Sequence, residues 1–509
     1  MVSSGSSVAG TWRRGEALLT VRVGMINDGA YPYRHGVAAT WSHRLIRGLP
    51  EDDFDLISIG DHSTALPAYQ PPSNTRSLTS IPVIGRPIGP IRGRAALAHR
   101  RFATHAAVLL CRGMMSDAPH SHAMFRSSLR RLTTASATGI HPLHGVPLPA
   151  VLLDAWRAAG TNVEAILPQP ALPQPTAADA ETIAAVLERT LRVLSTPVEA
   201  ADLHHATDAS LSALVAIAAK WRAGTPFVLT EHDTYLTASI LAEATGRPGV
   251  RTVLLRFLRS LARLAYQEAT QIAAPTERLR RWALDHGADP AILTIVGYGV
   301  DPHSCPPLRG EPAEPTITFL GPDRDTVTLL RTLPRLRAVH PDVRLIVGAP
   351  AVTTSVIKPG DSVFFLGPVN HRRSAYATGQ IVVVSGRHEA APYALIEAMM
   401  CRRPTILLDD GALSAVAGTA ADIVPYRDED RLADVCLALL GSADRRRSQS
   451  TAGSQRARSL FALRTTIDAV RTVYAEATAD TTDLIRRITM TDADIANDLV
   501  GDLIGDRAS

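Results

Sequence analysis

The chain has 509 residues, of which 46% are hydrophobic and 20% charged, with a formal net charge of +4. This length exceeds what one hydrophobic core usually serves and predicts two domains with insertions. No apolar run reaches the roughly 18 residues that a membrane span needs, and the N-terminus lacks the apolar stretch of a signal peptide, so we expect a cytoplasmic protein.

The basic pI, near 9.0, does not point to nucleic acid. Nearly all basic residues are arginines, and the clusters Arg130-Arg131 and Arg445–Arg447 lack interleaved aromatic residues, which is typical of solvated helix faces. The four cysteines are scattered without C-x-x-C spacing and predict reduced thiols. The histidine pairs lack partner ligands at a recognisable spacing, so we expect neither a zinc framework nor another metal site.

Residues 1–17 are rich in Ser and Gly, and we expect them to be disordered. Strands and helices then alternate through residues 18–300, with predicted strands at 19–26, 54–59, 198–206 and 226–230, helices at 37–49, 210–221 and 251–268, and a strand-turn-helix unit at 271–285. Within this domain we interpret 61–195 as an insertion. Its first part, 61–93, predicts a long loop, and 94–195 is largely helical, interrupted by two LPQP repeats at 167–170 and 172–175.

A segment with five prolines, residues 301–315, predicts a linker between domains. Residues 316–477 then repeat the alternation, with predicted elements at 316–320, 326–339, 343–347, 363–366, 381–384, 392–400 and 405–408. Apolar strands without strict alternation indicate parallel sheets covered on both faces. We therefore predict an α/β protein of two Rossmann-like parallel-sheet domains facing a cleft, with ligands at the carboxyl ends of the strands.

The most informative stretch is SGRHEAAPYALIEAMMCRR, residues 385–403, which follows a predicted strand. Pro392 suits the first turn of a helix, and such a turn offers free N–H groups to a phosphate. Glu389 would lie just before the helix, and Glu397 about a turn and a half inside it. An ordinary strand-turn-helix with two solvated glutamates is the alternative.

This stretch resembles the E-x7-E motif of the retaining glycosyltransferases of family 4, which have the GT-B fold. Three further blocks are similar to the PelF-type branch of that family: the YPY loop in 23–50, the T-E-H strand end in 225–235, and the segment 273–301. The resemblance implies transfer of a sugar from a nucleotide-diphosphate sugar, most often a UDP-sugar, to a polysaccharide or glycoconjugate acceptor with retention of configuration. It implies no cofactor, and membrane-bound polysaccharide assembly proteins as partners.

The resemblance also assigns roles to residues. Glu397 would hold the ribose from the surface of the cleft, Glu389 would contact the donor sugar, and His232 would act near the reacting carbon; His232 and Glu389 are the candidate catalytic residues. The other candidates for the nucleotide sugar are Gly321, Arg324, Ala390, Ala391, Pro392 and Tyr393, and those of the acceptor loop are Tyr31, Tyr33, His35 and Gly36. A hydrogen-bonded histidine at a strand end is the alternative for His232, and core packing is the alternative for the two tyrosines.

Four departures from the family pattern oppose a fully active enzyme. Pro322 stands where an arginine that contacts the diphosphate is expected, and Arg324 is the cation nearest in sequence. The others are His35-Gly36 for a Gly-Gly pair, Tyr298 for an Asn, and Ala415 for a Glu. The rival hypothesis is therefore a catalytically impaired binding subunit of a polysaccharide assembly system. A sugar-nucleotide epimerase is a third possibility, against which the YPY and T-E-H blocks argue.

Residues 478–509 predict an acidic amphipathic tail, with Leu484, Ile488, Ile495, Leu499 and Leu503 on one helix face. We expect this face to pack on the protein itself, with docking of a partner as the alternative.

Overall fold

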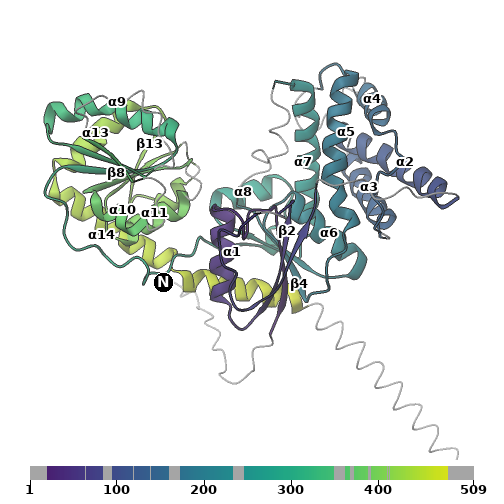
Figure 1. Ribbon diagram of the computed structural model, residues 1–509, viewed down its shortest axis with the longest axis horizontal. Coiled ribbons are helices and arrows are strands. Elements are labelled where there is room, and N and C mark those ends of the chain that lie inside the picture. The colour runs from purple at the N-terminus through teal and green to yellow at the C-terminus, as the bar shows by residue number, and fades with distance from the viewer. Residues whose placement is uncertain are drawn as a thin grey trace, which may run out of the picture.

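The computed structural model describes residues 20–62, 65–83, 94–118, 120–137, 139–159, 172–232, 246–348, 362–366, 372–387, 391–409, 411 and 413–479. These residues form two α/β domains side by side (Figure 1). The N-terminal segment predicted to be disordered, the first LPQP repeat and the acidic tail from residue 480 lie outside the described residues. No helix in the described ranges is both long enough and apolar enough to cross a membrane.

The first domain is built on a sheet of seven parallel strands in the order β3-β2-β1-β4-β5-β6-β7. The strands are β1 Arg22–Asn27, β2 Asp53–Ile59, β3 Thr75–Ile81, β4 Leu203–Ala206, β5 Phe227–Thr230, β6 Gln271–Ala274 and β7 Leu293–Ile295. The strands β4 and β5 are buried along their whole length, as expected for a sheet covered on both faces.

The strand β3 corrects the prediction that residues 61–93 form only a loop. It pairs with β2 at the edge of the sheet. Of its seven residues only the last, Ile81, is buried, and the six from Thr75 to Ser80 are partly or fully exposed. A strand at an edge needs no apolar run, because one side of it has no strand to pair with and its faces are only partly covered. The strand was therefore not predicted, because its sequence TRSLTSI is mostly polar.

The helices of the first domain are α1 Val37–Gly48, α2 Arg94–Met115, α3 Ser121–Ala135, α4 Leu148–Ala159, α5 Ala177–Leu191, α6 Leu211–Ala223, α7 Pro248–Glu268 and α8 Glu277–Asp285, with short 3-10 helices η1 Arg192–Ser195 and η4 Pro290–Ile292. The inserted helices α2 to α5 form a lobe beside α6 and α7 (Figure 1). One hydrophobic core joins the lobe to the sheet, so the insertion is part of the domain rather than an appendage.

The second domain has a sheet of six parallel strands in the order β10-β9-β8-β11-β12-β13. They are β8 Thr316–Leu320, β9 Arg344–Gly348, β10 Val363–Phe365, β11 Ile381–Ser385, β12 Thr405–Leu408 and β13 Asp422–Val424. The helices are α9 Asp323–Val339, α10 Arg372–Thr378, α11 Ala391–Met400, α12 Ser414–Ala417, α13 Glu429–Leu440 and α14 Ala443–Leu460. Two parallel-sheet α/β domains confirm the predicted fold class.

Side-chain caps fix where several helices begin. The hydroxyl of Thr276 accepts from the N–H of Leu279 at the start of α8, and Asp428 and Ser442 cap α13 and α14 in the same way. Such caps satisfy N–H groups that have no partner within the helix.

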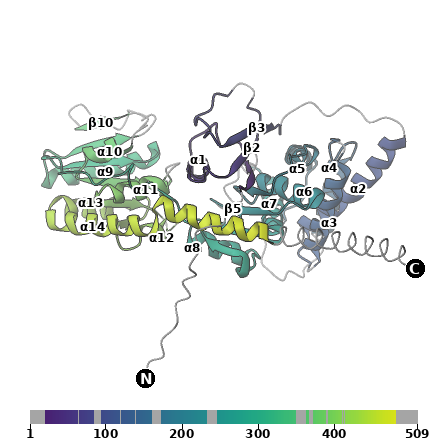
Figure 2. The ribbon, with the colours of Figure 1, turned by 90° about the horizontal axis from the view of Figure 1, so that it is seen from below.

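After α14 the chain returns to the first domain as helical residues 463–479 (Figure 2). Ile467 packs against Gly48 at the end of α1, and Arg471 pairs with Glu51 at 2.7 Å. The hydroxyl of Tyr474 is hydrogen-bonded to Nδ1 of the buried His205 at 2.7 Å, and Thr230 Oγ1 lies 2.8 Å from the other ring nitrogen. The first domain is therefore completed by a segment that follows the second.

We predict that Tyr474→Phe lowers the free energy of unfolding by about 1–3 kcal/mol, because it leaves a buried histidine nitrogen without a partner. Tyr393→Phe is the matched control. Tyr393 is equally buried, but its hydroxyl has no hydrogen-bond partner among the described residues, so its removal should be neutral or stabilising. Urea denaturation of both variants measures the difference, and equal losses would contradict a role for the Tyr474–His205 bond.

Candidate functional site

The loop after β1 is shaped by Asn27, which is buried. Its side-chain oxygen accepts from the N–H groups of Gly29 and Tyr31, both at 3.1 Å. Gly29 has φ +87°, and a Cβ atom there would lie 2.6 Å from the carbonyl oxygen of Ile59, so no larger residue fits. The loop thus turns sharply at the carboxyl end of β1, where an open parallel sheet binds ligands.

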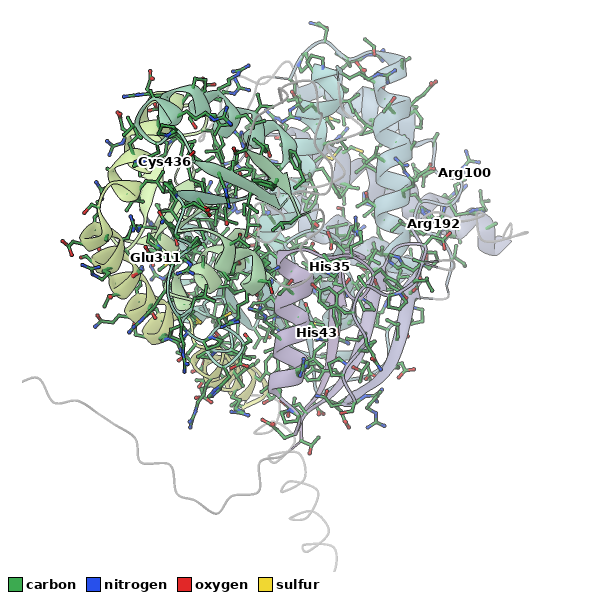
Figure 3. The ribbon with its side chains drawn as sticks, turned by 60° about the vertical axis from the view of Figure 1, so that its left-hand side comes forward. His35, His43, Arg100, Arg192, Glu311 and Cys436 are labelled. Carbon is green, nitrogen blue, oxygen red and sulfur yellow. The ribbon has the colours of Figure 1, made fainter. Side chains whose placement is uncertain are left out.

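The two tyrosines of this loop differ in their surroundings. Tyr31 is fully buried, and its hydroxyl lies 3.1 Å from Nδ1 of His43, so core packing describes Tyr31. Tyr33 is half-buried and stacks on the imidazole of His62 with the ring centroids 4.0 Å apart. His35 is exposed and approaches the edge of the Tyr69 ring; Figure 3 labels His35 and His43 beside α1. The acceptor role of the loop stays a prediction.

A series of aromatic rings joins the two domains. Trp41 of α1 meets His232, at the carboxyl end of β5, edge to face with the centroids 5.0 Å apart. The ring of His232 stacks on that of Tyr298 with the centroids 6.2 Å apart and an angle of 29° between the planes. The ring of Tyr298 meets that of Tyr393 of α11 edge to face, with the centroids 5.6 Å apart. The predicted residues His232 and Tyr393 are thereby placed in one continuous cluster, although 160 residues separate them in the chain.

Several polar atoms of this cluster have no hydrogen-bond partner among the described residues. They are Nε1 of Trp41, both ring nitrogens of His232 and the hydroxyl of Tyr393. Burial lowers the pKa of His232 to about 3, so the imidazole is neutral near pH 7. Buried polar groups without partners are rare in folded proteins, and they are the groups that a bound water or ligand would satisfy.

Glu397 of α11 lies at the centre of an ion-pair network between the domains. Arg372 of α10 donates to both of its oxygens, at 2.7 and 2.8 Å, and Arg44 of α1 in the first domain donates to Oε1 at 2.8 Å. The hydroxyl of Tyr376 donates to Oε2 at 3.2 Å. Arg44 also donates to the carbonyl oxygen of Gly299 at 2.8 Å.

These contacts overturn the expectation that Glu397 lies on the surface of a cleft. Glu397 is only 5% exposed, and its carboxylate accepts four hydrogen bonds, two at each oxygen. Burial alone would raise the pKa of Glu397, but the hydrogen bonds and charges of Arg372 and Arg44 outweigh it and lower the pKa below its usual value. The alternative of a solvated glutamate is excluded for Glu397, and its ribose role stays a prediction.

The predicted phosphate-binding loop is short and closely packed. A Cβ atom at Gly321 would lie 2.4 Å from the ring of Phe319, and Pro322 directly precedes α9. Behind the loop, Ser385 donates to Asp325 at 2.5 Å, and Arg387 pairs with Asp325 at 3.4 Å while its guanidinium covers the ring of Tyr426 at 3.6 Å. Arg387 is therefore held by its own domain.

Other predicted residues lie wholly or partly outside the described residues. Glu389 and Ala390 are not described, and for Arg324 and Ala391 the side chains are not described. Pro392 and Tyr393 occupy the first turn of α11 and are buried, at the carboxyl end of β11. The parts of the chain that the structure describes contain no group of three or more potential metal ligands.

Sequence reasoning missed Arg44, Arg372 and Trp41. In a chain whose basic residues are almost all arginine, nothing local distinguishes these two arginines from solvated ones. A weak signal existed for Arg44: it lies three residues after Trp41 in the predicted amphipathic helix, and residues at that spacing are neighbours on a helix surface.

A cavity of about 280 Å³ lies at the junction of the domains, away from these residues. Its lining includes Thr276, Ile295, Ala415, Arg456 and Phe461. Ala415 stands where the family pattern has a glutamate, and Arg456 donates to its carbonyl oxygen at 2.6 Å. The cavity contains none of the predicted site residues.

Residues 21–291, just over half of the chain, match the family described as a domain of unknown function, DUF3492. Residues 314–442 match the family described as glycosyl transferases group 1. The chain has no match among curated proteins.

Solved structures with the same architecture have low sequence identity to this chain. Anabaena Alr3699/HepE in complex with UDP and glucose is 13% identical over 89% of this chain and 99% of HepE, with a TM-score of 0.50. The N-terminal domain of Candida albicans trehalose-6-phosphate phosphatase is 11% identical over 91% of this chain and 98% of its own, with a TM-score of 0.52. At these identities the likeness shows the fold alone, and that fold is GT-B.

We predict that Glu397→Gln lowers the free energy of unfolding at pH 7 by about 3 kcal/mol, because two half-buried guanidiniums lose their counter-charge. A carboxyl group whose pKa is lowered by folding stabilises the protein above its unfolded pKa of about 4.3, and this contribution disappears as the pH falls through the folded pKa. The difference between the variant and the wild type should therefore shrink as the pH is lowered below about 4.

Urea denaturation at pH 7 and at pH 3.5 checks this expectation. Glu277→Gln is the control, because Glu277 pairs with Arg280 and Arg281 only on an exposed helix surface and should cost less than about 1 kcal/mol. A difference for Glu397→Gln that stays constant down to pH 3.5 would contradict the role of its charge.

Proposed function

This chain belongs to the DUF3492 family, and we propose that it is a retaining glycosyltransferase that moves a sugar from a nucleotide-diphosphate sugar to a glycan acceptor. Its second domain is a glycosyl transferase group 1 domain, within the GT-B fold. The donor that we favour is a UDP-sugar, because HepE, which shares the fold, was crystallised with UDP and glucose. Family 4, the PelF-type branch and a polysaccharide or glycoconjugate acceptor belong to the same proposal.

The observation that carries the proposal is the position of α11. Its first turn, with Pro392 and Tyr393, begins just past the carboxyl end of β11 in the group 1 domain. The N–H groups of such a turn and the positive end of the helix dipole stabilise a phosphate. Since Tyr393 is also part of the ring series that leads to His232, a donor bound at this turn would be directed towards the first domain.

The proposed chemistry needs a stabilised leaving group more than a nucleophile. A diphosphate leaving group gains its stabilisation from N–H groups and cations fixed before the reaction. His232 is neutral and its ring nitrogens lack protein partners among the described residues, so it can bond a hydroxyl group of the donor sugar or of the acceptor. Glu389 keeps its predicted contact with the donor sugar in this proposal.

A second candidate is the impaired binding subunit. It is favoured by Pro322, which offers no charge at the start of α9, and by the four donors that occupy the carboxylate of Glu397. Such a subunit would bind a nucleotide without turning over a sugar donor, and membrane-bound polysaccharide assembly proteins would be its partners.

We predict that one of UDP, GDP and ADP raises the melting temperature of the purified protein. A nucleotide at 100 times its dissociation constant stabilises the folded state by about 2.7 kcal/mol. Differential scanning calorimetry with each nucleotide, and with the matching nucleoside monophosphate as control, measures the shift. If none of the three shifts the melting temperature, both candidate functions are wrong.

For the enzyme candidate we further predict that His232→Asn lowers the rate of nucleoside-diphosphate release from the sugar donor at least about 100-fold while nucleotide affinity stays unchanged, because His232 acts at the sugar. The control is His303→Asn, since His303 is an exposed residue of the linker. Nucleotide binding by a wild-type protein that releases no nucleoside diphosphate from any donor would favour the binding subunit instead.

A further inference from the structure

We propose that Arg44 is a positioning residue that exchanges partners. In the free protein its guanidinium binds Glu397, and in the nucleotide complex it binds the diphosphate while the ribose takes its place on Glu397. This inference rests on the proposed function and adds to it a residue from the first domain.

The first argument is the occupancy of Glu397. An ionised carboxylate offers about four acceptor positions. Oε1 accepts from Arg44 and Arg372, and Oε2 accepts from Arg372 and from the hydroxyl of Tyr376, whose one hydrogen is shared with the carbonyl oxygen of Ala394. A ribose hydroxyl can therefore bond to Glu397 only after one of these donors leaves.

The second argument identifies the donor that leaves. Arg372 is held by two hydrogen bonds in a bidentate pair, and Tyr376 belongs to the same domain as Glu397 and is fully buried. Arg44 makes a single hydrogen bond to Glu397 and another to the carbonyl oxygen of Gly299, comes from the other domain, and is 21% exposed at its side chain. It is therefore the donor that a ligand displaces at least cost.

The third argument gives the released guanidinium a new partner. The guanidinium of Arg44 already lies over the ring of Tyr393, with its Cζ 4.4 Å from the ring centroid. Tyr393 belongs to the first turn of α11, where we propose that the diphosphate binds. The buried hydroxyl of Tyr393 has no partner among the described residues, which independently indicates that this turn is built for a ligand. Pro322 stands where the family pattern has a cation, and Arg387 is held by Asp325 and Tyr426. Arg44 therefore adds a charge from across the domain boundary to that of the candidate Arg324 at the start of α9.

The experiment compares a nucleoside with its diphosphate on Arg44→Gln, by calorimetric titration with uridine and UDP, or with the pair whose base the wild type prefers. The variant should bind the diphosphate about tenfold to hundredfold more weakly, since a charge-assisted hydrogen bond is lost. It should bind the nucleoside as well as the wild type or several-fold more tightly, since a position on Glu397 has become free. A purely structural role for Arg44 would weaken both equally.

Two further variants make the outcome decisive. Arg44→Lys keeps the charge and should recover part of the diphosphate affinity. Arg47→Gln, on an exposed residue of the same helix, should change neither affinity. Equal changes for nucleoside and diphosphate in Arg44→Gln, or no change in either, would overturn the exchange while leaving the proposed function intact, whereas a wild-type protein that binds no nucleotide would overturn the proposed function itself.

Discussion

The structure depends on one buried carboxylate, that of Glu397, which draws together two arginines from two domains. Burying a charge is unfavourable unless it is paired and hydrogen-bonded, and here every acceptor position is filled. A hydrophobic cluster that includes Trp41, Tyr298 and Tyr393 continues across the same boundary. Charge pairing and apolar packing thus act at one place, and the faces that would hold the two substrates are positioned by the same contacts.

The architecture could be predicted from the sequence because the strands inside each sheet are apolar throughout, as in Ile381–Ser385, and because the E-x7-E segment places a helix directly after one of them. The edge strand β3 could not, since an edge strand needs no apolar run. The T-E-H and E-x7-E segments predicted that His232 follows a strand and that Tyr393 lies in the first turn of a helix, and the structure has both there, while their roles at the site stay predictions. The partners of Glu397 could not be predicted, because Arg44 is 353 residues away in the chain and no sequence pattern distinguishes it from a solvated arginine.

The site combines features that favour catalysis with features that oppose it. In the ring series from Trp41 to Tyr393, several polar atoms have no partner among the residues that the structure describes, an arrangement that costs stability and is typical of functional sites. Pro322, in contrast, puts no cation at the position where the family pattern has one, and Arg324 in the first turn of α9 stands between Asp323 and Asp325. An arginine from the facing domain reconciles the two observations, because charge missing from one wall of a binding site can be supplied from the other.

The return of residues 463–479 to the first domain also constrains how the protein is made. His205 lies in a central strand of the first sheet, yet its hydrogen-bond partner Tyr474 is synthesised 269 residues later. Domains usually fold as units while they emerge from the ribosome. Here the first domain must wait for residues 463–479, with Nδ1 of a buried histidine without its partner in the meantime. The nascent protein is therefore exposed to aggregation for longer than its two-domain layout suggests.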